Sequence, residues 1–130
     1  MAMRKLIPTL MADNMDRTIA FYRDLLGFQL YEVAPDQSPY TWAVLRCDGV
    51  DLSIEARSSF LEEKEWVFLE GAPLGGTIVL YIEIEGIDEL YQRIRNQVDV
   101  VSPLAAQPYG MREFTLRDCN GYVLAFGERL

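Results

Sequence analysis

Histidine is absent from the 130-residue sequence. This absence removes the commonest metal ligand of proteins and the commonest general base near neutral pH. Cysteine is scarce as well, with Cys47 and Cys119 alone. Both occupy equivalent positions of the internal repeat described below, and each precedes a turn at the end of its own copy. We therefore expect two free thiols in a reducing compartment rather than a disulfide, and no nucleophile–base pair is evident.

Positively charged residues are few, with 12 Lys and Arg against 20 Asp and Glu, which gives a net charge of −8. Proteins that bind nucleic acids attract phosphates with Lys and Arg, so this balance argues against such a partner. The acidic balance permits a cationic ligand, although solubility alone also explains it.

Apolar segments are all too short to span a membrane, and the first residues have neither the apolar stretch nor the cleavage site of a signal peptide. We expect a cytoplasmic protein with no membrane partner. Half of the residues are apolar and a quarter are charged, which is typical of a globular domain with a real core.

The sequence repeats itself. When it is displaced by 72 positions without a gap, residues of the first part fall on identical residues of the second part. The matched residues are Asp16, Arg23, Cys47, Gly49 and Leu52, which fall on Asp88, Arg95, Cys119, Gly121 and Leu124. Each copy has an apolar strand, an amphipathic helix and further extended segments. The repeat predicts one domain (1–130) of two βαβββ modules, at about 4–57 and 77–130, joined by a linker over 58–76.

The expected fold class is α+β, with one helix packed on one face of a small, cupped, mostly antiparallel sheet in each module. Alternation and turn residues predict where the strands lie. The expected strands of the first module are Leu6–Ala12, Phe28–Val33, Tyr40–Arg46 and Val50–Glu55. Those of the second are Ile78–Ile84, Val98–Val101, Glu113–Arg117 and Tyr122–Gly127, with a loop over Pro103–Gly110.

Alternation along the strands also separates a face that packs on the helix from an open face. Under the displacement, Trp42 and Val44 match Phe114 and Leu116, so all four are expected on the helix side. The open face is mixed apolar and acidic, and we predict that it binds a ligand. The predicted ligand-binding residues are Thr9, Met11, Asp51, Glu55, Tyr81, Glu83, Glu113 and Arg117. The alternative for each is an exposed position at a sheet edge.

Several segments resemble the vicinal oxygen chelate superfamily, which includes glyoxalase I, bleomycin-resistance proteins and extradiol dioxygenases. In the first half these are Pro8-Thr-Leu-Met-Ala-Asp-Asn and Thr18-Ile-Ala-Phe-Tyr-Arg-Asp-Leu-Leu-Gly-Phe28. In the second half they are Tyr81–Asp88 and Tyr109–Glu128, which include Arg-Asp-Cys-Asn-Gly-Tyr. The family usually has proline where this chain has Cys119, and that departure affects only a turn.

The resemblance implies paired βαβββ modules, often a homodimer, with the ligand in the cupped sheets. Metal-dependent members of this family hold a divalent ion with four His or Glu residues on inner strands. Carried over by motif, those positions are Ile7, Ser53, Val79 and Ala125. None is a normal ligand of such an ion, so we expect no metal and no cofactor. A displaced site built from Glu55 and Glu83 remains an alternative.

Three functions fit these expectations. The first is a metal-independent binding protein like the bleomycin-resistance members, which sequesters a cationic or aromatic small molecule in an acidic groove, with Tyr81 and Trp66 stacking on it. The second is an isomerase or lyase without metal, using Glu83 or Glu55 as base and Tyr81 as acid. The third is a dimeric regulatory module without chemistry. We place binding first and predict no catalytic residue.

Overall fold

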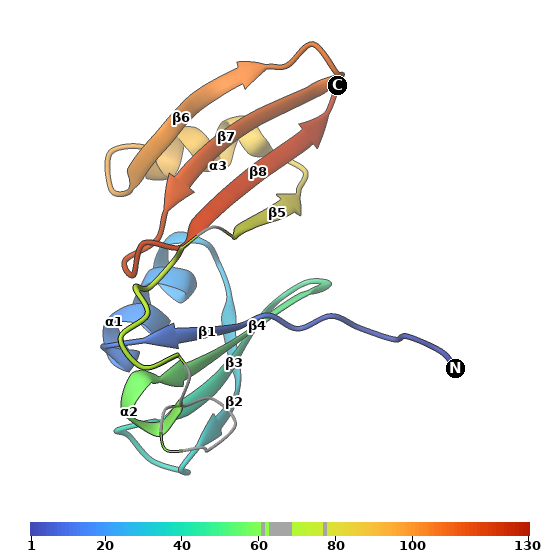
Figure 1. Cartoon of the computed structure of the whole chain (residues 1–130). Coiled ribbons are helices and arrows are strands. Elements are labelled where there is room, and N and C mark those ends of the chain that lie inside the picture. The colour runs from blue at the N-terminus through green and yellow to red at the C-terminus, as the bar shows by residue number, and fades with distance from the viewer. Residues whose placement is uncertain (61, 63–68, 77) are drawn as a thin grey trace. The chain divides into compact units, whose positions relative to one another are not determined.

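The computed structural model describes residues 1–60, 62, 69–76 and 78–130. The chain forms two compact units, unit 1 (Met1–Ala72) and unit 2 (Pro73–Leu130). Each unit contains one four-stranded sheet with a helix packed on it (Figure 1). In the described part of the chain, no helix is long and apolar enough to cross a membrane.

Unit 1 has the sheet order β1-β4-β3-β2, in which β1 runs parallel to β4 and the other neighbours are antiparallel. Its elements are β1 (Thr9–Ala12), α1 (Met15–Ala20), the π-helical turn η1 (Phe21–Leu25), β2 (Gln29–Ala34), β3 (Trp42–Cys47), β4 (Val50–Ala56) and α2 (Arg57–Phe60).

Local signals explain where α1 begins and where the helical segment ends. The side chain of Asn14 accepts a hydrogen bond from the backbone N–H of Arg17 at 2.9 Å, which caps the first turn. Ile19 and Tyr22 are buried at 4% and 0% exposure, as expected for the apolar side of an amphipathic helix. Gly27, with φ of 80°, follows the π-helical turn in the left-handed conformation that glycine adopts easily.

Unit 2 repeats this plan with the sheet order β5-β8-β7-β6, in which β5 is parallel to β8. Its elements are β5 (Val79–Glu83), α3 (Ile87–Ile94), β6 (Asp99–Ala106), β7 (Met111–Arg117) and β8 (Val123–Arg129). Its core contains fully buried side chains from helix and sheet, namely Ile87, Ile94, Leu116 and Leu124. The predicted α+β class, with two βαβββ modules and mostly antiparallel pairing, is confirmed.

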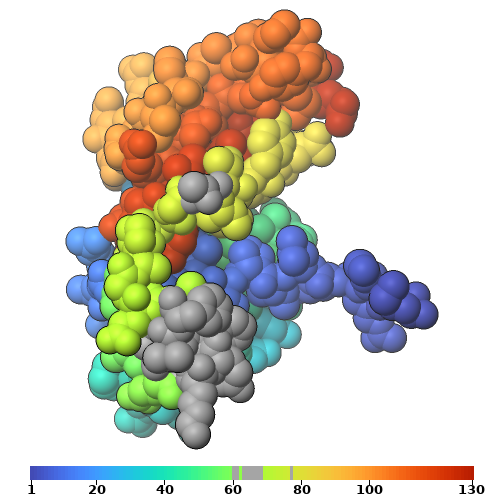
Figure 2. All heavy atoms as spheres, in the orientation of Figure 1, coloured from blue at the N-terminus to red at the C-terminus, as the bar shows by residue number. Residues whose placement is uncertain are grey.

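Two predicted boundaries are wrong by more than two residues. The first strand begins at Thr9 rather than Leu6, and Leu6 is 89% exposed in the extended N-terminal segment, drawn in dark blue in Figure 2. The first half of the predicted loop Pro103–Gly110 is strand, because β6 continues to Ala106. This strand lies at the sheet edge and carries register irregularities, which is where a proline can be accommodated. The predicted linker begins with the short helix α2, and Trp66 lies outside the described residues.

The predicted facing of β3 is also wrong. Val44 pairs with Ser53, and Trp42 pairs with Glu55, so these side chains share the open face. Ala43 and Leu45 take the helix side instead, and both are fully buried. In β7 the prediction is right, because Phe114 pairs with Phe126 and lies on the buried face.

The reversal in β3 comes from the hairpin turns. In unit 1, Cys47 pairs with Val50, which leaves the two residues Asp48 and Gly49 between them. In unit 2 the N–H of Asp118 donates to the carbonyl of Tyr122 at 2.8 Å, which leaves three residues. The repeat therefore needs a one-residue gap, and one residue of slip turns every side chain of a strand to the other face.

Candidate functional site

The strand register places all eight predicted ligand-binding residues on the open faces of their sheets, four in each unit. Thr9, Met11, Asp51 and Glu55 belong to unit 1, and Tyr81, Glu83, Glu113 and Arg117 to unit 2. The two faces differ in exposure. Met11 and Asp51 are buried at 7% and 6%, whereas Tyr81 is 50% exposed.

The centre of the open face of unit 2 is a carboxylate held by two phenols. The hydroxyl of Tyr81 donates to Glu113 Oε2 at 2.6 Å, and the hydroxyl of Tyr109 donates to Glu113 Oε1. We call these three residues the phenol–carboxylate cluster. Tyr81 comes from β5 and Glu113 from β7, and the strand between them is β8. The ring of Tyr81 therefore reaches across β8.

Gly127 of β8 makes this reach possible. It pairs with Glu83 on one side and with Glu113 on the other, so it lies directly between them on the sheet. A Cβ at Gly127 would lie 2.0 Å from the hydroxyl oxygen of Tyr81 and 2.7 Å from its ring carbon. Only glycine leaves room for the phenol there, which is one reason for a glycine to stand inside a strand.

The hydrogen bonds change the acidity of both phenols. The bond to Glu113, with burial and the nearby charges of Glu113 and Glu83, raises the pKa of Tyr81 to about 12. The bond to the same carboxylate also raises the pKa of Tyr109. Both phenols therefore keep their protons at neutral pH and continue to donate to Glu113.

Sequence reasoning identified Tyr81 and Glu113 but missed Tyr109 and Gly127. Tyr109 fell in a predicted loop, for which alternation gives no facing. Gly127 appeared only as the last residue of a predicted strand. A glycine inside a strand of otherwise larger residues is the signal that could have indicated the close approach of another side chain.

The other charged residues of this face are paired with residues of unit 2. Arg129 Nη2 lies 3.3 Å from Glu83 Oε1, and Arg117 Nη1 lies 3.5 Å from Asp99 Oδ2. These pairs are solvent-exposed, so each contributes little to stability. Arg129, however, places a positive charge beside Glu83, and the prediction of an acidic groove did not include this charge.

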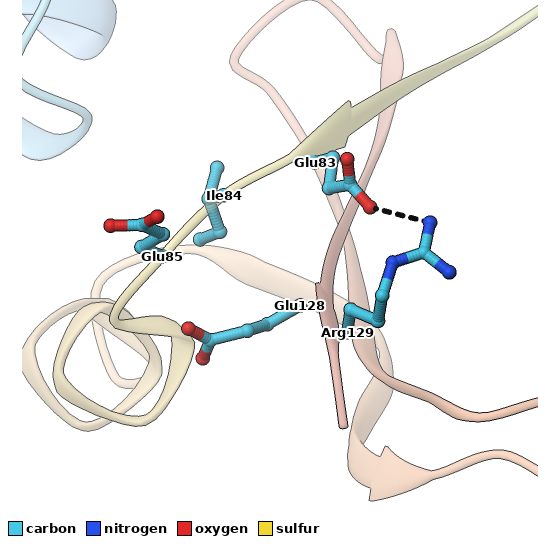
Figure 3. Close-up of a pocket in the computed structure, with 5 residues that line it drawn as sticks. All are labelled: Glu83, Ile84, Glu85, Glu128 and Arg129. Atoms are coloured by element: carbon cyan, nitrogen blue, oxygen red, sulfur yellow. Dashed lines mark hydrogen bonds and ion pairs between the residues drawn. The ribbon is translucent and has the colours of Figure 1, made fainter.

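A pocket of about 540 Å³ opens beside Glu83, at the end of β5 (Figure 3). Its lining residues are Glu83, Ile84, Glu85, Glu128 and Arg129. The carboxylate of Glu128 accepts hydrogen bonds from the backbone N–H groups of Gly86 at 2.9 Å and Ile87 at 3.1 Å. It thereby caps the first turn of α3, where the helix dipole favours an anion.

In unit 1, Asp51 is held by cations of the chain itself. Arg46 donates to both of its oxygens, at 2.8 and 3.0 Å, and Lys5 binds Oδ2. The guanidinium of Arg46 also lies over the ring of Tyr31, 3.6 Å from its centroid. The Arg46 bond, followed by that of Lys5, holds the pKa of Asp51 well below its usual range.

The positions at which the resemblance places metal ligands do not fit a divalent ion. Ile7, Val79 and Ala125 have no donor atom that could bind one. The hydroxyl of Ser53 accepts a hydrogen bond from Trp42 Nε1 at 2.9 Å, and Ser53 is 5% exposed. Within 1–60, 62, 69–76 and 78–130, no three Cys, Asp or Glu side chains are grouped so that they could hold a metal ion.

Comparison with known proteins agrees with this architecture. Bleomycin resistance proteins of Geobacillus stearothermophilus and Staphylococcus aureus are 30% identical over 132 residues, covering 95% of this chain and 96% of theirs. A glyoxalase/bleomycin resistance protein/dioxygenase from Nocardioides has a TM-score of 0.78 at 21% identity, covering 100% of this chain and 86% of that one. TioX from Micromonospora sp. ML1 has a TM-score of 0.76 at 20% identity, covering 98% and 99%. These two likenesses show the fold.

The sequence also matches the family profile over residues 7–126, which include every strand of both units except the last residues of β8. The chain therefore belongs to the Glyoxalase/Bleomycin resistance protein/Dioxygenase superfamily.

Proposed function

We propose that the protein binds a small cationic or aromatic molecule, without a metal, on the open face of unit 2. The observation that carries the proposal is the phenol–carboxylate cluster. Glu113 supplies a negative charge on an exposed sheet face, and the rings of Tyr81 and Tyr109 flank it at 50% and 65% exposure. Both the carboxylate and the aromatic ring faces attract a cation, and this attraction is stronger when the site is partly shielded from water.

The charges favour Glu113 over the other predicted carboxylates as the centre of binding. Asp51 is buried and bonded to Arg46 and Lys5, so its charge is balanced within unit 1. The charge of Glu83 is partly balanced by its ion pair with Arg129. The acidic groove of the proposal is therefore a local site around Glu113, to which Glu83 adds a smaller attraction.

The similarity to proteins named for bleomycin resistance supports a role in which a molecule is sequestered rather than converted. We propose a function of the antibiotic-resistance type on this ground. The alternative of a metal-free enzyme with Tyr81 as its acid is less well supported, because a phenol with a pKa of about 12 releases its proton poorly at neutral pH.

We also propose, from the family, that residues 1–130 act as one domain and that the protein is a cytoplasmic homodimer. Light scattering during size-exclusion chromatography tests the oligomeric state, and a mass of one chain would contradict the dimer.

Calorimetric titration with bleomycin and with small cationic aromatic molecules tests the binding function. We expect Glu113→Gln to weaken binding about tenfold or more, because a charge-assisted attraction is lost. Glu83→Gln should have a smaller effect, since Arg129 already shares that charge, and both effects should shrink at high salt. Glu89→Gln is the matched control, because it removes the same charge from an exposed position of α3. Equal affinities of the wild type and Glu113→Gln would overturn the proposal.

A further inference from the structure

We propose that the phenol–carboxylate cluster selects fully alkylated ammonium groups over ammonium or guanidinium groups that carry N–H donors. This inference rests on the proposed function and names the chemical class of ligand for the same site. It follows from how the acceptor atoms, ring faces and apolar groups around Glu113 are used.

The first step concerns hydrogen-bond acceptors. A carboxylate offers about four lone-pair positions on its two oxygens. Tyr81 occupies one on Oε2 and Tyr109 one on Oε1, so about half of this capacity is used within the protein. The negative charge remains, because both donors are neutral phenols. The cluster therefore offers full charge with reduced capacity to accept new hydrogen bonds.

The second step concerns the neighbouring acceptor. Among the described residues of this face, Glu83 is the nearby carboxylate, since its charge acts on Tyr81. Glu83 already lies 3.3 Å from a nitrogen of Arg129. A primary ammonium with three N–H groups, or a guanidinium with more, would thus compete with Arg129 and the two phenols. A ligand N–H group that loses its water and finds no acceptor on the protein costs free energy. A fully alkylated ammonium has no N–H group and avoids this cost.

The third step concerns the surface that methyl groups would meet. The phenol of Tyr81 covers Gly127, and Met111 is buried at 9% exposure, so the rings of Tyr81 and Tyr109 are the apolar surface that a ligand would meet. Two exposed tyrosine rings beside a negative charge are a set of groups that recognises alkylated ammonium cations in proteins.

A matched series of ligands tests this selectivity. Benzyltrimethylammonium, benzylammonium and benzylguanidinium share one aromatic ring and one charge but differ in their N–H groups. Neopentylbenzene has the shape of the first without its charge. We expect the trimethyl compound to bind about tenfold more tightly than benzylammonium and the neutral compound to bind least.

The variants Tyr81→Phe and Tyr109→Phe separate the acceptor argument from a general preference for apolar ligands. Each variant keeps the aromatic ring but removes one hydroxyl donor, so one lone pair of Glu113 becomes available to a ligand. Benzylammonium should then bind more tightly, and the preference for the trimethyl compound should shrink. Because Tyr109 is 65% exposed, its variant should fold even if the other does not. Thermal unfolding checks the folding of both.

The outcomes distinguish this inference from the proposed function. Equal binding of all three cations, or tighter binding of benzylammonium, overturns the selectivity while leaving cation binding intact. A preference that persists unchanged in both phenylalanine variants also overturns it. Equal binding of the neutral compound overturns the role of the charge of Glu113 and with it the selectivity. Failure of all four compounds to bind overturns the proposed function as well.

Discussion

Trp42 in β3 stands at the position that Glu113 holds in β7. Trp42 pairs with Glu55 of the last strand of unit 1, and Glu113 pairs with Gly127, the equivalent residue of unit 2. In unit 1 the indole N–H of Trp42 donates a hydrogen bond to the hydroxyl of Ser53. In unit 2 a carboxylate occupies the same place and receives two phenols. The two modules share a backbone plan, but their open faces differ in chemistry at this central position.

The glycine in β8 leads to a specific prediction. In Gly127→Ala the added Cβ would overlap the hydroxyl of Tyr81, so the phenol must swing away and lose its bond to Glu113. We expect the pKa of Tyr81 to fall from about 12 towards its ordinary value of 10.0, measured by ultraviolet titration of the tyrosines. The stability cost should stay near 1 kcal/mol, because the displaced group is the exposed end of a side chain.

Gly49→Ala is the control for this experiment, since a Cβ at Gly49 would meet no atom within 4 Å. Its tyrosine titration should match the wild type. A Gly127→Ala protein whose tyrosines titrate as in the wild type would show that Tyr81 does not depend on this glycine.

Much of the fold could be predicted from the sequence, because the internal repeat and the alternation of apolar residues act over whole elements. Phe114 and Leu116 were placed correctly in the core. The facing of Trp42 could not be predicted, because it depends on whether a hairpin turn has two or three residues. Gly49 and Gly121 align perfectly in the repeat, and this identity concealed the difference.

The sheet face on which each candidate residue lies could be predicted, but the hydrogen bonds and ion pairs among these residues could not. Alternation placed Tyr81, Glu83 and Glu113 on one face, since that depends only on the period of a strand. Which of these charges are compensated depends on long-range partners, and Glu83 with Arg129 is separated by 46 positions. No local pattern encodes such a pair.

The ion pairs of Asp51 predict an acid-dependent loss of stability. Its folded pKa lies well below the ordinary value of 3.8 for an aspartate, so the unfolded chain binds the proton more readily than the folded chain. The stabilisation is therefore complete above the unfolded pKa and is lost as the pH falls below it towards the folded pKa. We expect Asp51→Asn to be less stable than the wild type at neutral pH, and the difference to shrink in acid.

Urea unfolding followed by circular dichroism between neutral pH and about pH 2 measures this difference. Asp36→Asn is the control, because Asp36 is exposed in the turn after β2. It should leave the stability nearly unchanged at all pH values. A difference between Asp51→Asn and the wild type that stays constant down to the lowest pH would contradict the depressed pKa.

The bond between Trp42 and Ser53 predicts energetic coupling within unit 1. The indole donates to a hydroxyl that is 5% exposed, so either Trp42→Phe or Ser53→Ala leaves the other group without this partner. We expect each single variant to lower the free energy of unfolding, and the double variant to lose about 1 kcal/mol less than the sum. Ser102→Ala, at an exposed position of β6, should instead combine additively with Trp42→Phe. Full additivity of Trp42→Phe with Ser53→Ala would mean that the hydroxyl at this family metal position is not engaged by the indole in solution.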